Sequence, residues 1–318
     1  MGLPSMRPTG WFQVAWSADL EVGDVKPLQY FGADLVAFRD LDGAVHVLDA
    51  YCQHLGADLS HGGCVVEGGI QCPFHGWVWS GDDGHNVRIP YEPQPDGARY
   101  VRSWNVTELN ECIYIWHDLG RHEPVWPVPD ARQELGSVIG SQYFRPIGPD
   151  ERQFFAGVTV HPQVIAESSV DRQHHRFVHH VPVSPIVLAA SANESSWHAS
   201  IGFGKGDPVQ ITWYGVGLSL NCECHGDGIQ VISICPTPVD DVTTDIFATY
   251  WISENLDYDY RLEAAKRMLL DDIDIWAHQQ YLDRPGLAPS EADDFTHLRE
   301  WASGFYPQAQ PERRNVTL

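Results

Sequence analysis

The sequence predicts an α+β protein in which an all-β N-terminal part precedes a C-terminal part of strands and helices. Roughly the first 120 residues are short apolar runs between glycine-containing turns, as in LVAFRDLDGAVHVLDAYC, a pattern typical of β-strands. The later segments VQITWYGVGLSL, IQVISIC and TTDIFATYWI also have strand composition, with Pro236 and Pro238 separating the last two. Helical patterns cover residues 165–180, ending before Pro182, and a longer stretch from Asp257 to Leu282.

The length of 318 residues suits two domains. A proline-rich stretch from Glu123 to Asp130 marks the end of the first, so we expect domains at residues 1–125 and 126–318. No apolar run approaches the length of a membrane span, and the N-terminus lacks the apolar region of a secretory signal. We therefore expect a cytoplasmic location.

Charge and cysteine content exclude some classes of partner and indicate possible metal ligands. The formal net charge of −23 argues against nucleic acid and against anionic membranes as partners, because both would repel such a surface. The chain has seven cysteines, an odd number. In a chain without a secretory signal, this indicates metal ligands and free thiols rather than a disulfide framework.

The strongest motif is a pair of short boxes, each offering one thiolate and one imidazole. Cys52-Gln-His54 is followed, 17 residues later, by Cys72-Pro-Phe-His75. A [2Fe–2S] cluster in which two histidines replace two cysteines on one iron needs these four ligands. A Cys2His2 zinc site uses the same ligand types, but zinc fingers usually pair Cys with Cys and His with His. The mixed boxes therefore favour the cluster.

Glycines flank both boxes. Gly56, Gly62, Gly63 and Gly76 would let two loops pack closely around a cluster. The stretch CQHLGADLS…CPFHGWVWSGDDG resembles the Rieske domain of ring-hydroxylating oxygenases. Respiratory Rieske proteins usually carry an additional cysteine in each box, where this chain has Ala57 and Phe74. The resemblance therefore implies the oxygenase or ferredoxin type of cluster.

A second group of metal-ligating residues lies between Glu167 and His180, in the run ESSVDRQHHRFVHH. Two histidines and one carboxylate on one face of Fe(II) leave coordination positions open for oxygen. Asp171 and His174 are three residues apart and share a helix face. His174 and His179 are five apart, so they share a metal only if the helix ends or distorts, whereas His175 and His179 form the better helical pair. Spacing alone leaves His174, His175 and His180 open as partners of His179.

The spacing Asp-x2-His-x4-His resembles that of Rieske oxygenases. The resemblance implies that His174 and His179 are iron ligands and that Asp171 connects the two metal centres. The third ligand is expected on the long helix, where Asp272 follows Leu262, Ala265 and Leu269 on an otherwise apolar ridge. Periodicity alone does not separate Asp272 from Asp271.

Two further segments resemble one branch of that family. The run Asp272-Ile-Asp-Ile-Trp276 resembles the Asp-x-x-Ile-Trp motif of 3-ketosteroid 9α-hydroxylases and cholesterol 7-desaturases, in which the first Asp binds iron. The ending from Leu298 to Tyr306, LREWASGFY, is similar to the end of the same enzymes. These resemblances imply Asp272 as the third iron ligand and an antiparallel sheet gripping the long helix.

The family resemblance implies a terminal oxygenase with a [2Fe–2S] Rieske cluster, a mononuclear Fe(II), O2 as co-substrate and a hydrophobic, steroid-like substrate. It also implies a homotrimer. Electrons would come from NAD(P)H through a separate reductase or ferredoxin, because the chain has no GxGxxG nucleotide motif. Two alternatives remain: a Rieske-type electron carrier, which needs only the first motif, and an oxygenase that demethylates, desaturates or dioxygenates an aromatic or amine substrate.

Overall fold

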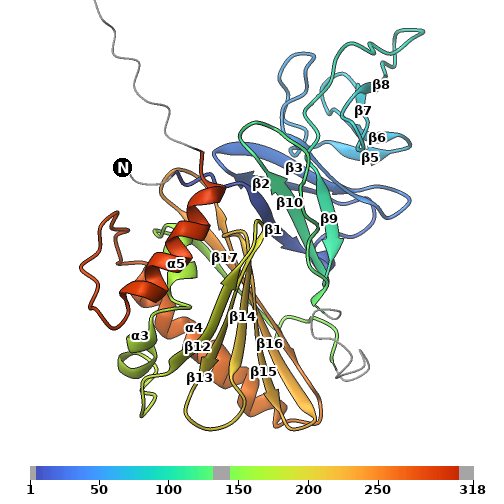
Figure 1. Cartoon of the computed structure of the whole chain (residues 1–318). Coiled ribbons are helices and arrows are strands. Elements are labelled where there is room, and N and C mark those ends of the chain that lie inside the picture. Colours follow the sequence, from blue (N-terminus) through green and yellow to red (C-terminus); the bar gives the residue numbers. More distant parts are fainter. Residues whose placement is uncertain (1–4, 132–143, 308–318) are drawn as a thin grey trace, which may run out of the picture.

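The computed structural model describes residues 5–131 and 144–307, and its two halves are built differently (Figure 1). Residues up to His117 form three small antiparallel sheets, and a single seven-stranded antiparallel sheet begins at Arg152. The predicted α+β class and the all-β N-terminal part are confirmed. The domain boundary near residue 125 stays a prediction. No helix in the described ranges is long and apolar enough to cross a membrane.

Ten strands make up the N-terminal half within residues 5–131. The first sheet has the order β1-β10-β9, the second β2-β3-β4 and the third β5-β6-β7-β8. The strands are β1 (Gly10–Trp16), β2 (Val25–Tyr30), β3 (Ala33–Arg39), β4 (Val45–Asp49), β5 (Cys64–Val66), β6 (Gly69–Gln71), β7 (Val78–Trp79), β8 (Asn86–Arg88), β9 (Val106–Leu109) and β10 (Cys112–His117), with a 3-10 turn η1 (Ser17–Asp19) after β1. The third sheet carries the loops that contain the two Cys/His boxes.

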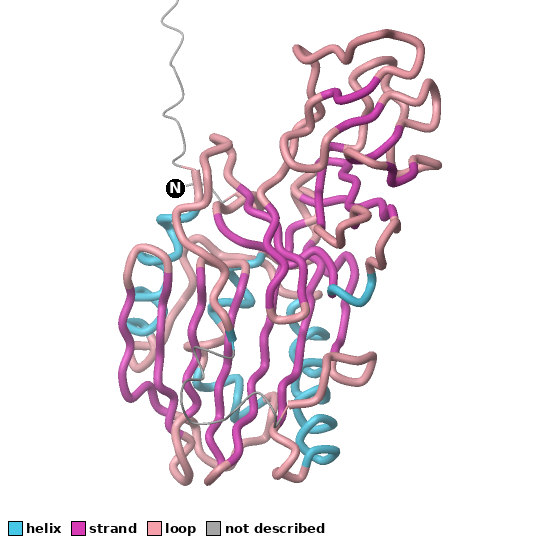
Figure 2. The backbone as a smooth tube through the Cα atoms, turned by 90° about the vertical axis from the view of Figure 1, so that its right-hand side faces the viewer, coloured by secondary structure: helices cyan, strands magenta, loops and turns pink. Residues whose placement is uncertain are grey.

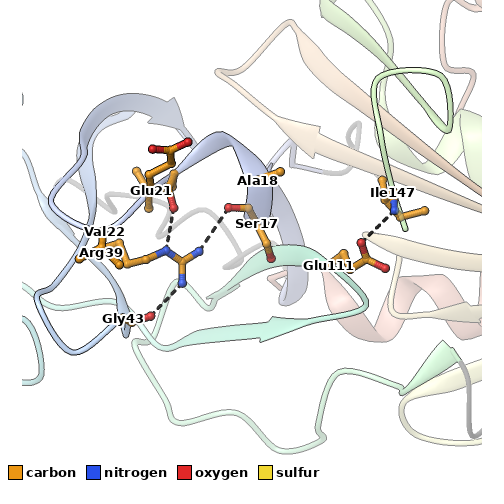
Figure 3. Close-up of a pocket in the computed structure, with 9 residues that line it drawn as sticks. Ser17, Ala18, Glu21, Val22, Arg39, Gly43, Glu111 and Ile147 are labelled. Atoms are coloured by element: carbon orange, nitrogen blue, oxygen red, sulfur yellow. Dashed lines mark hydrogen bonds between the residues drawn. The ribbon is translucent and has the colours of Figure 1, made fainter. Parts of the chain in front are cut away.

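The hollow drawn in Figure 3 is lined mostly by residues of this half, one of which is an arginine with a structural role. Arg39 donates hydrogen bonds to the carbonyl oxygens of Ser17, Leu20 and Gly43. Its guanidinium also pairs with Glu108, with a shortest N–O distance of 2.7 Å, and this partner lowers the pKa of the glutamate. Because its donors are engaged by the protein, Arg39 fastens η1 to β3 and is not a ligand-binding group.

The C-terminal half is a sheet with helices on one face. Its strand order is β11-β17-β16-β15-β14-β13-β12, so that β12 and β11 are the edges. The strands are β11 (Arg152–Val158), β12 (Ile186–Ala192), β13 (Ser196–Gly202), β14 (Val209–Tyr214), β15 (Leu218–His225), β16 (Gly228–Pro238) and β17 (Thr244–Ile252). The helices are α2 (Pro162–Glu167), α3 (Arg172–Phe177), α4 (Tyr258–Trp276), α5 (Ala292–Ala302) and the 3-10 turn η4 (Ser303–Phe305).

Two sequence predictions about these elements are wrong in detail. The helix expected over residues 165–180 is two short helices, because Asp171 accepts hydrogen bonds from the amides of Gln173 and His174 and starts α3 as a new helix. The prolines expected to separate two strands lie inside β16. Since β16 pairs with β15 only as far as Ile234, Pro236 and Pro238 lie where a single neighbouring strand, β17, completes the ladder.

Each face of the large sheet has its own apolar core. One face packs against β1 and β10, where Trp16, Tyr114 and Phe247 are buried together and the Trp16 indole donates to the Thr249 hydroxyl at 3.0 Å. The other face packs against α2, α4 and α5, with Trp197, Trp213 and Leu262 in its core. The expected packing of a long helix against an antiparallel sheet is thus present, and the shared core holds α4 against one face of the sheet.

Candidate metal centres and cavity

The two Cys/His boxes form a matched pair of loops. In the first, the Cys52 amide donates to the Ala57 carbonyl at 2.9 Å and the Gly56 amide donates back to the Cys52 carbonyl at 2.9 Å. In the second, the Cys72 and Gly76 amides make the corresponding bonds at 2.8 and 3.1 Å. Gly56 and Gly76 both have positive φ, of 77° and 72°, which glycine adopts without strain. The backbone thus presents each box in the same way.

The four side chains of these boxes converge. Both cysteines are buried, and the imidazole centroids of His54 and His75 lie 4.7 Å apart. His54 stacks on Trp77 at 4.6 Å with parallel planes. The Trp79 indole donates to the Cys52 sulfur at 3.3 Å, a hydrogen bond suited to a cluster thiolate. Cys64, which lies between the boxes in sequence, is exposed and takes no part.

The chemistry of this donor set fits a Rieske cluster. Burial raises the pKa of the Cys52 thiol, and a nearby positive charge such as iron would favour its thiolate. The Nδ1 atom of His75 is buried and has no hydrogen-bond partner among the described residues. A buried imidazole nitrogen without a partner is costly unless a metal takes its lone pair. Two sulfurs and two imidazoles therefore lie close together, and the part of the chain that the structure describes supplies no partner for the buried His75 nitrogen.

The second group of ligands assembles from α3, the turn after it and α4. The Nε2 atoms of His179 and His174 lie 3.1 and 3.8 Å from the Asp272 Oδ1 atom. The His174 Nδ1 donates to the Asp171 carbonyl oxygen at 2.7 Å. The Nε2 atom of His174 therefore carries no proton, and its lone pair can bind a metal. Burial lowers the pKa of His174 below its ordinary value, as required of a neutral ligand.

The structure separates the two aspartates that periodicity could not. Asp272 lies on the buried ridge of α4 between Leu269 and Trp276, with its side chain 16% exposed, and faces the imidazoles. Asp271 is exposed on the outer side of the helix. Among the residues that the structure describes, Asp272 is the carboxylate within 4.0 Å of His174 and His179.

His175 also lies in this group. Its ligand atom and those of His174 and His179 are all within 4.8 Å of one another. Burial and the two neighbouring histidines lower the pKa of His175 to about 3, so it is neutral. Its ring packs edge-on against Phe203. No carboxylate of the described chain lies within salt-bridge distance of it, whereas both His174 and His179 face Asp272. His180 has a φ of 55° and lies outside this group.

Asp171 is a helix cap as well as a contact of His174. Its Oδ1 accepts from the amides of Gln173 and His174, both at 3.1 Å, and its carbonyl holds the His174 ring. A small cleft reaches this region from solvent and is lined by Asp171, His174 and Asp272 among others. Asp171 thus contacts the His174 ring through its backbone carbonyl and the His174 amide through its carboxylate.

A cavity of about 250 Å3 opens on the three histidines and Asp272. Its walls are apolar side chains of the sheet and of α4, among them Ile211, Ile232 and Leu269. Asn221, Glu223, Gln230 and Arg261 also line it. These polar residues were not predicted from the sequence. The pattern that could have indicated them is the alternation along β15 and β16, in which every second side chain faces the helix.

Comparisons with known protein families agree with this geometry. The model described as the Rieske [2Fe-2S] domain matches residues 10–107, and the model described as the 3-ketosteroid 9alpha-hydroxylase C-terminal domain matches residues 115–306. The chain belongs to the Rieske oxygenases of the 3-ketosteroid 9α-hydroxylase type. The resemblance that the sequence motifs indicated is confirmed.

Whole-chain relatives lie in the same group. Cholesterol 7-desaturase of Xenopus laevis is 30% identical, over 98% of this chain and 74% of its own. The enzyme of the same name from Drosophila melanogaster is 32% identical, over 96% and 76%. The oxygenase component of the 3-ketosteroid-9-alpha-monooxygenase of Mycolicibacterium smegmatis is 28% identical, over 96% and 84%.

Solved structures share the fold at lower identity. Dicamba monooxygenase bound to dicamba superposes with a TM-score of 0.72 at 18% identity, covering 95% of this chain and 98% of that one. NdmA of Pseudomonas putida CBB5 gives 0.71 at 19% identity, covering 92% and 88%. The chain therefore shares its fold with these solved structures over both of its halves.

Family membership confirms the predicted enzyme class and cofactors. The protein is the terminal component of an oxygenase that uses a Rieske [2Fe–2S] cluster, a mononuclear non-haem iron and O2. Its substrate is hydrophobic, and its electrons come from a separate donor protein. The electron-carrier alternative is excluded, because such a carrier has no need of the catalytic domain that residues 115–306 form.

Proposed function

We propose that this oxygenase hydroxylates a rigid, steroid-like polycycle. The observation that carries the proposal is the cavity between the sheet and α4, whose long walls are apolar and whose one end is formed by His174, His179 and Asp272. Relatives named for action on cholesterol and on 3-ketosteroids support the substrate class. A non-polar wall offers no directional partner to a small polar substrate, so a large apolar ligand is favoured.

We assign the metal ligands as follows. Cys52 and Cys72 hold one iron of the cluster, and His54 and His75 hold the other. His174, His179 and Asp272 hold the mononuclear iron, a set of two imidazoles and one carboxylate that leaves coordination positions open. When bound, these groups supply stored electrons and activation of O2 beside the substrate. His175 is left outside the set, because no described carboxylate faces it.

The surrounding residues prepare the site for this chemistry. The Asp171 carbonyl fixes the orientation and tautomer of His174, so that its Nε2 points towards Asp272. Ile211, Ile232 and Leu269 exclude water from the space where the substrate lies, which protects a reactive oxidant from side reactions. The same walls hold a rigid substrate in one orientation, so that a single carbon faces the iron.

We further propose an active homotrimer of head-to-tail subunits, with Asp171 connecting the cluster of one chain to the iron of the next. Figures 1 and 2 draw β5–β8 and the large sheet at opposite ends of the molecule, which favours transfer between chains over transfer within one. Exposed apolar side chains support such docking at both ends: Leu55 and Phe74 beside the cluster histidines, and Phe177 and Ile186 beside the iron-site turn. A heterologous contact of this kind closes into a ring.

None of the seven cysteines forms a disulfide, a state that a reducing compartment maintains. This supports a cytoplasmic location as part of the same proposal.

Turnover tests the substrate proposal. The purified protein, with a surrogate reductase and NAD(P)H, is given matched panels of steroids, small aromatics and quaternary amines. We expect oxygen uptake coupled to a hydroxylated product with at least one steroid, and no product from the other panels. Coupled product formation from an aromatic or amine, with none from any steroid, would contradict the proposal.

A further inference from the structure

The cavity has a second polar end, away from the iron ligands. Along β16 the side chains that face α4 are Gln230, Ile232 and Ile234, in that order from the β15–β16 turn. The inward face of the strand therefore changes from polar to apolar as it leaves the turn. Glu223 pairs directly with Gln230 in the register of β15 and β16, and Asn221 pairs with Ile232. Three polar side chains thus enter the end of the cavity that lies away from the iron ligands.

Gln230 is the most deeply buried of these groups. It is 6% exposed, and its Oε1 is buried without a hydrogen-bond donor in the part of the chain that the structure describes. A buried amide oxygen that lacks a donor destabilises the folded protein, so native structures provide a partner for it. Because Gln230 lines the cavity, a ligand in the cavity can supply that donor.

Neighbouring residues add hydrogen-bond donors. Arg261 lines the same cavity from the first turns of α4, and neither it nor Asn221 makes a side-chain hydrogen bond or ion pair within residues 5–131 and 144–307. Glu223 is engaged by His225, at 3.1 Å. The start of α4 is close to Gln230 because β17, which immediately precedes the helix, pairs Ile252 with Gln230.

The polar end lies far from the iron ligands. Arg261 precedes Asp272 on the same helix by eleven residues, which at the rise of an α-helix is roughly 16 Å. A ligand that reaches both ends must therefore be long, and the walls between them require it to be apolar.

We propose that Asn221, Gln230 and Arg261 form a binding subsite for an alcohol at the far end of the substrate. A hydroxyl both donates and accepts, so it can donate to the Gln230 Oε1 and accept from the Arg261 guanidinium or the Asn221 amide. A ketone cannot donate to that oxygen, and a carboxylate would face the negative charge of Glu223. This inference rests on the proposed steroid-like substrate and adds which end group the enzyme selects.

Binding to the iron-loaded protein tests this subsite without turnover. Three steroids that differ at one carbon of a terminal ring are titrated calorimetrically under anaerobic conditions: the alcohol, the ketone and the deoxygenated parent. We expect the alcohol to bind about tenfold more tightly than either of the others, since each of them leaves the Gln230 oxygen without a donor. Equal or tighter binding of the ketone or the parent would overturn the subsite while leaving a steroid-like substrate in place.

Two variants locate the effect. Gln230→Met keeps the length of the side chain and removes its polar atoms, so it should abolish the preference for the alcohol, and the parent compound, which no longer leaves an oxygen without a donor, should bind more tightly than it does to the unaltered protein. Arg261→Gln should weaken binding of the alcohol severalfold, whereas Arg267→Gln, at an exposed position of the same helix, should leave that binding unchanged. If Gln230→Met weakens the binding of all three steroids equally, the subsite is disproved. If none of the three steroids binds the unaltered protein, the substrate proposal fails together with the subsite.

Discussion

The cluster loops and the iron site hold similar ligands by different means. The cluster loops are one compact stretch from Cys52 to His75, fastened by paired turn hydrogen bonds and by the Trp79 indole. The iron site joins a six-residue helix, α3, none of whose residues is fully buried, to the long helix α4. The first site is therefore set by its own backbone, and the second by the docking of α3 against α4. Changes should affect folding at the first and metal binding or electron transfer at the second.

The largest effect is expected at Asp272. Asp272→Ala removes the carboxylate that faces His174 and His179, so the mononuclear iron should fall to near zero and turnover by at least about a thousandfold. The visible spectrum of the cluster should not change, because the cluster loops do not depend on α4. Iron analysis and absorbance measure both quantities. Asp271→Ala, at the exposed neighbour, is the control and should retain iron; loss of iron from the control alone would mean that the ligand is Asp271.

Asp171 tests the connection between the sites. Asn is as good a helix cap as Asp, so Asp171→Asn should keep α3, both metals and the trimer. Turnover should nevertheless fall by roughly a hundredfold, since the charged group proposed to join the two centres is lost. Single-turnover product from fully reduced protein is the measurement. Near-normal product from Asp171→Asn, or an active monomer, would show that Asp171 is only a cap.

The N-terminal half should respond to pH through His117. Burial lowers the pKa of this histidine to about 4, and its Nδ1 donates to the Pro8 carbonyl. The unfolded chain takes up its proton near pH 6.5, so stability is highest above that pH and falls as the pH drops to about 4, by roughly 3 kcal/mol in all. Urea unfolding at several pH values measures this fall. His117→Gln, which keeps a donor, should flatten the curve in that window; an unchanged slope would assign it to other groups.

A smaller effect is expected from the glycine of the second cluster loop. Gly76→Ala would place a Cβ 2.9 Å from the Pro90 Cγ atom at a φ of 72°, which should cost about 1–2 kcal/mol of unfolding free energy and weaken cluster retention. Gly97→Ala, where a Cβ meets nothing within 4 Å, is the matched control. Thermal unfolding with absorbance at the cluster bands compares them. Equal melting temperatures for the two variants would mean that the loop yields more easily than its hydrogen bonds imply.

The same contrast explains what the sequence could predict. The four residues of the cluster boxes can be predicted from spacing, because their loops are local in the sequence and the ligand types are rare together. The choice among His174, His175 and His180 as partners of His179 stayed open because periodicity assumes one continuous helix, whereas α3 ends at Phe177 and His179 lies beyond it. The choice between Asp271 and Asp272 depends on which side of α4 packs against the sheet. Periodicity alone could not predict this, because it is a property of the tertiary structure.

The polar end of the cavity was missed for the same reason. Asn221, Gln230 and Arg261 come from two strands and a helix, and each alone resembles an ordinary surface residue in sequence. Their convergence depends on strand register and on where α4 begins. By contrast, the all-β N-terminal part and the long helix followed directly from turn spacing and apolar periodicity.

The central claim is that one chain carries two separate iron sites. Metal and sulfide analysis of the purified protein, with electron paramagnetic resonance of the reduced form, tests it most directly. We predict about three iron atoms and two inorganic sulfides per chain, with the signal of a histidine-ligated [2Fe–2S] cluster. Zinc in place of the cluster, or no iron beyond the two atoms of the cluster, would contradict the account.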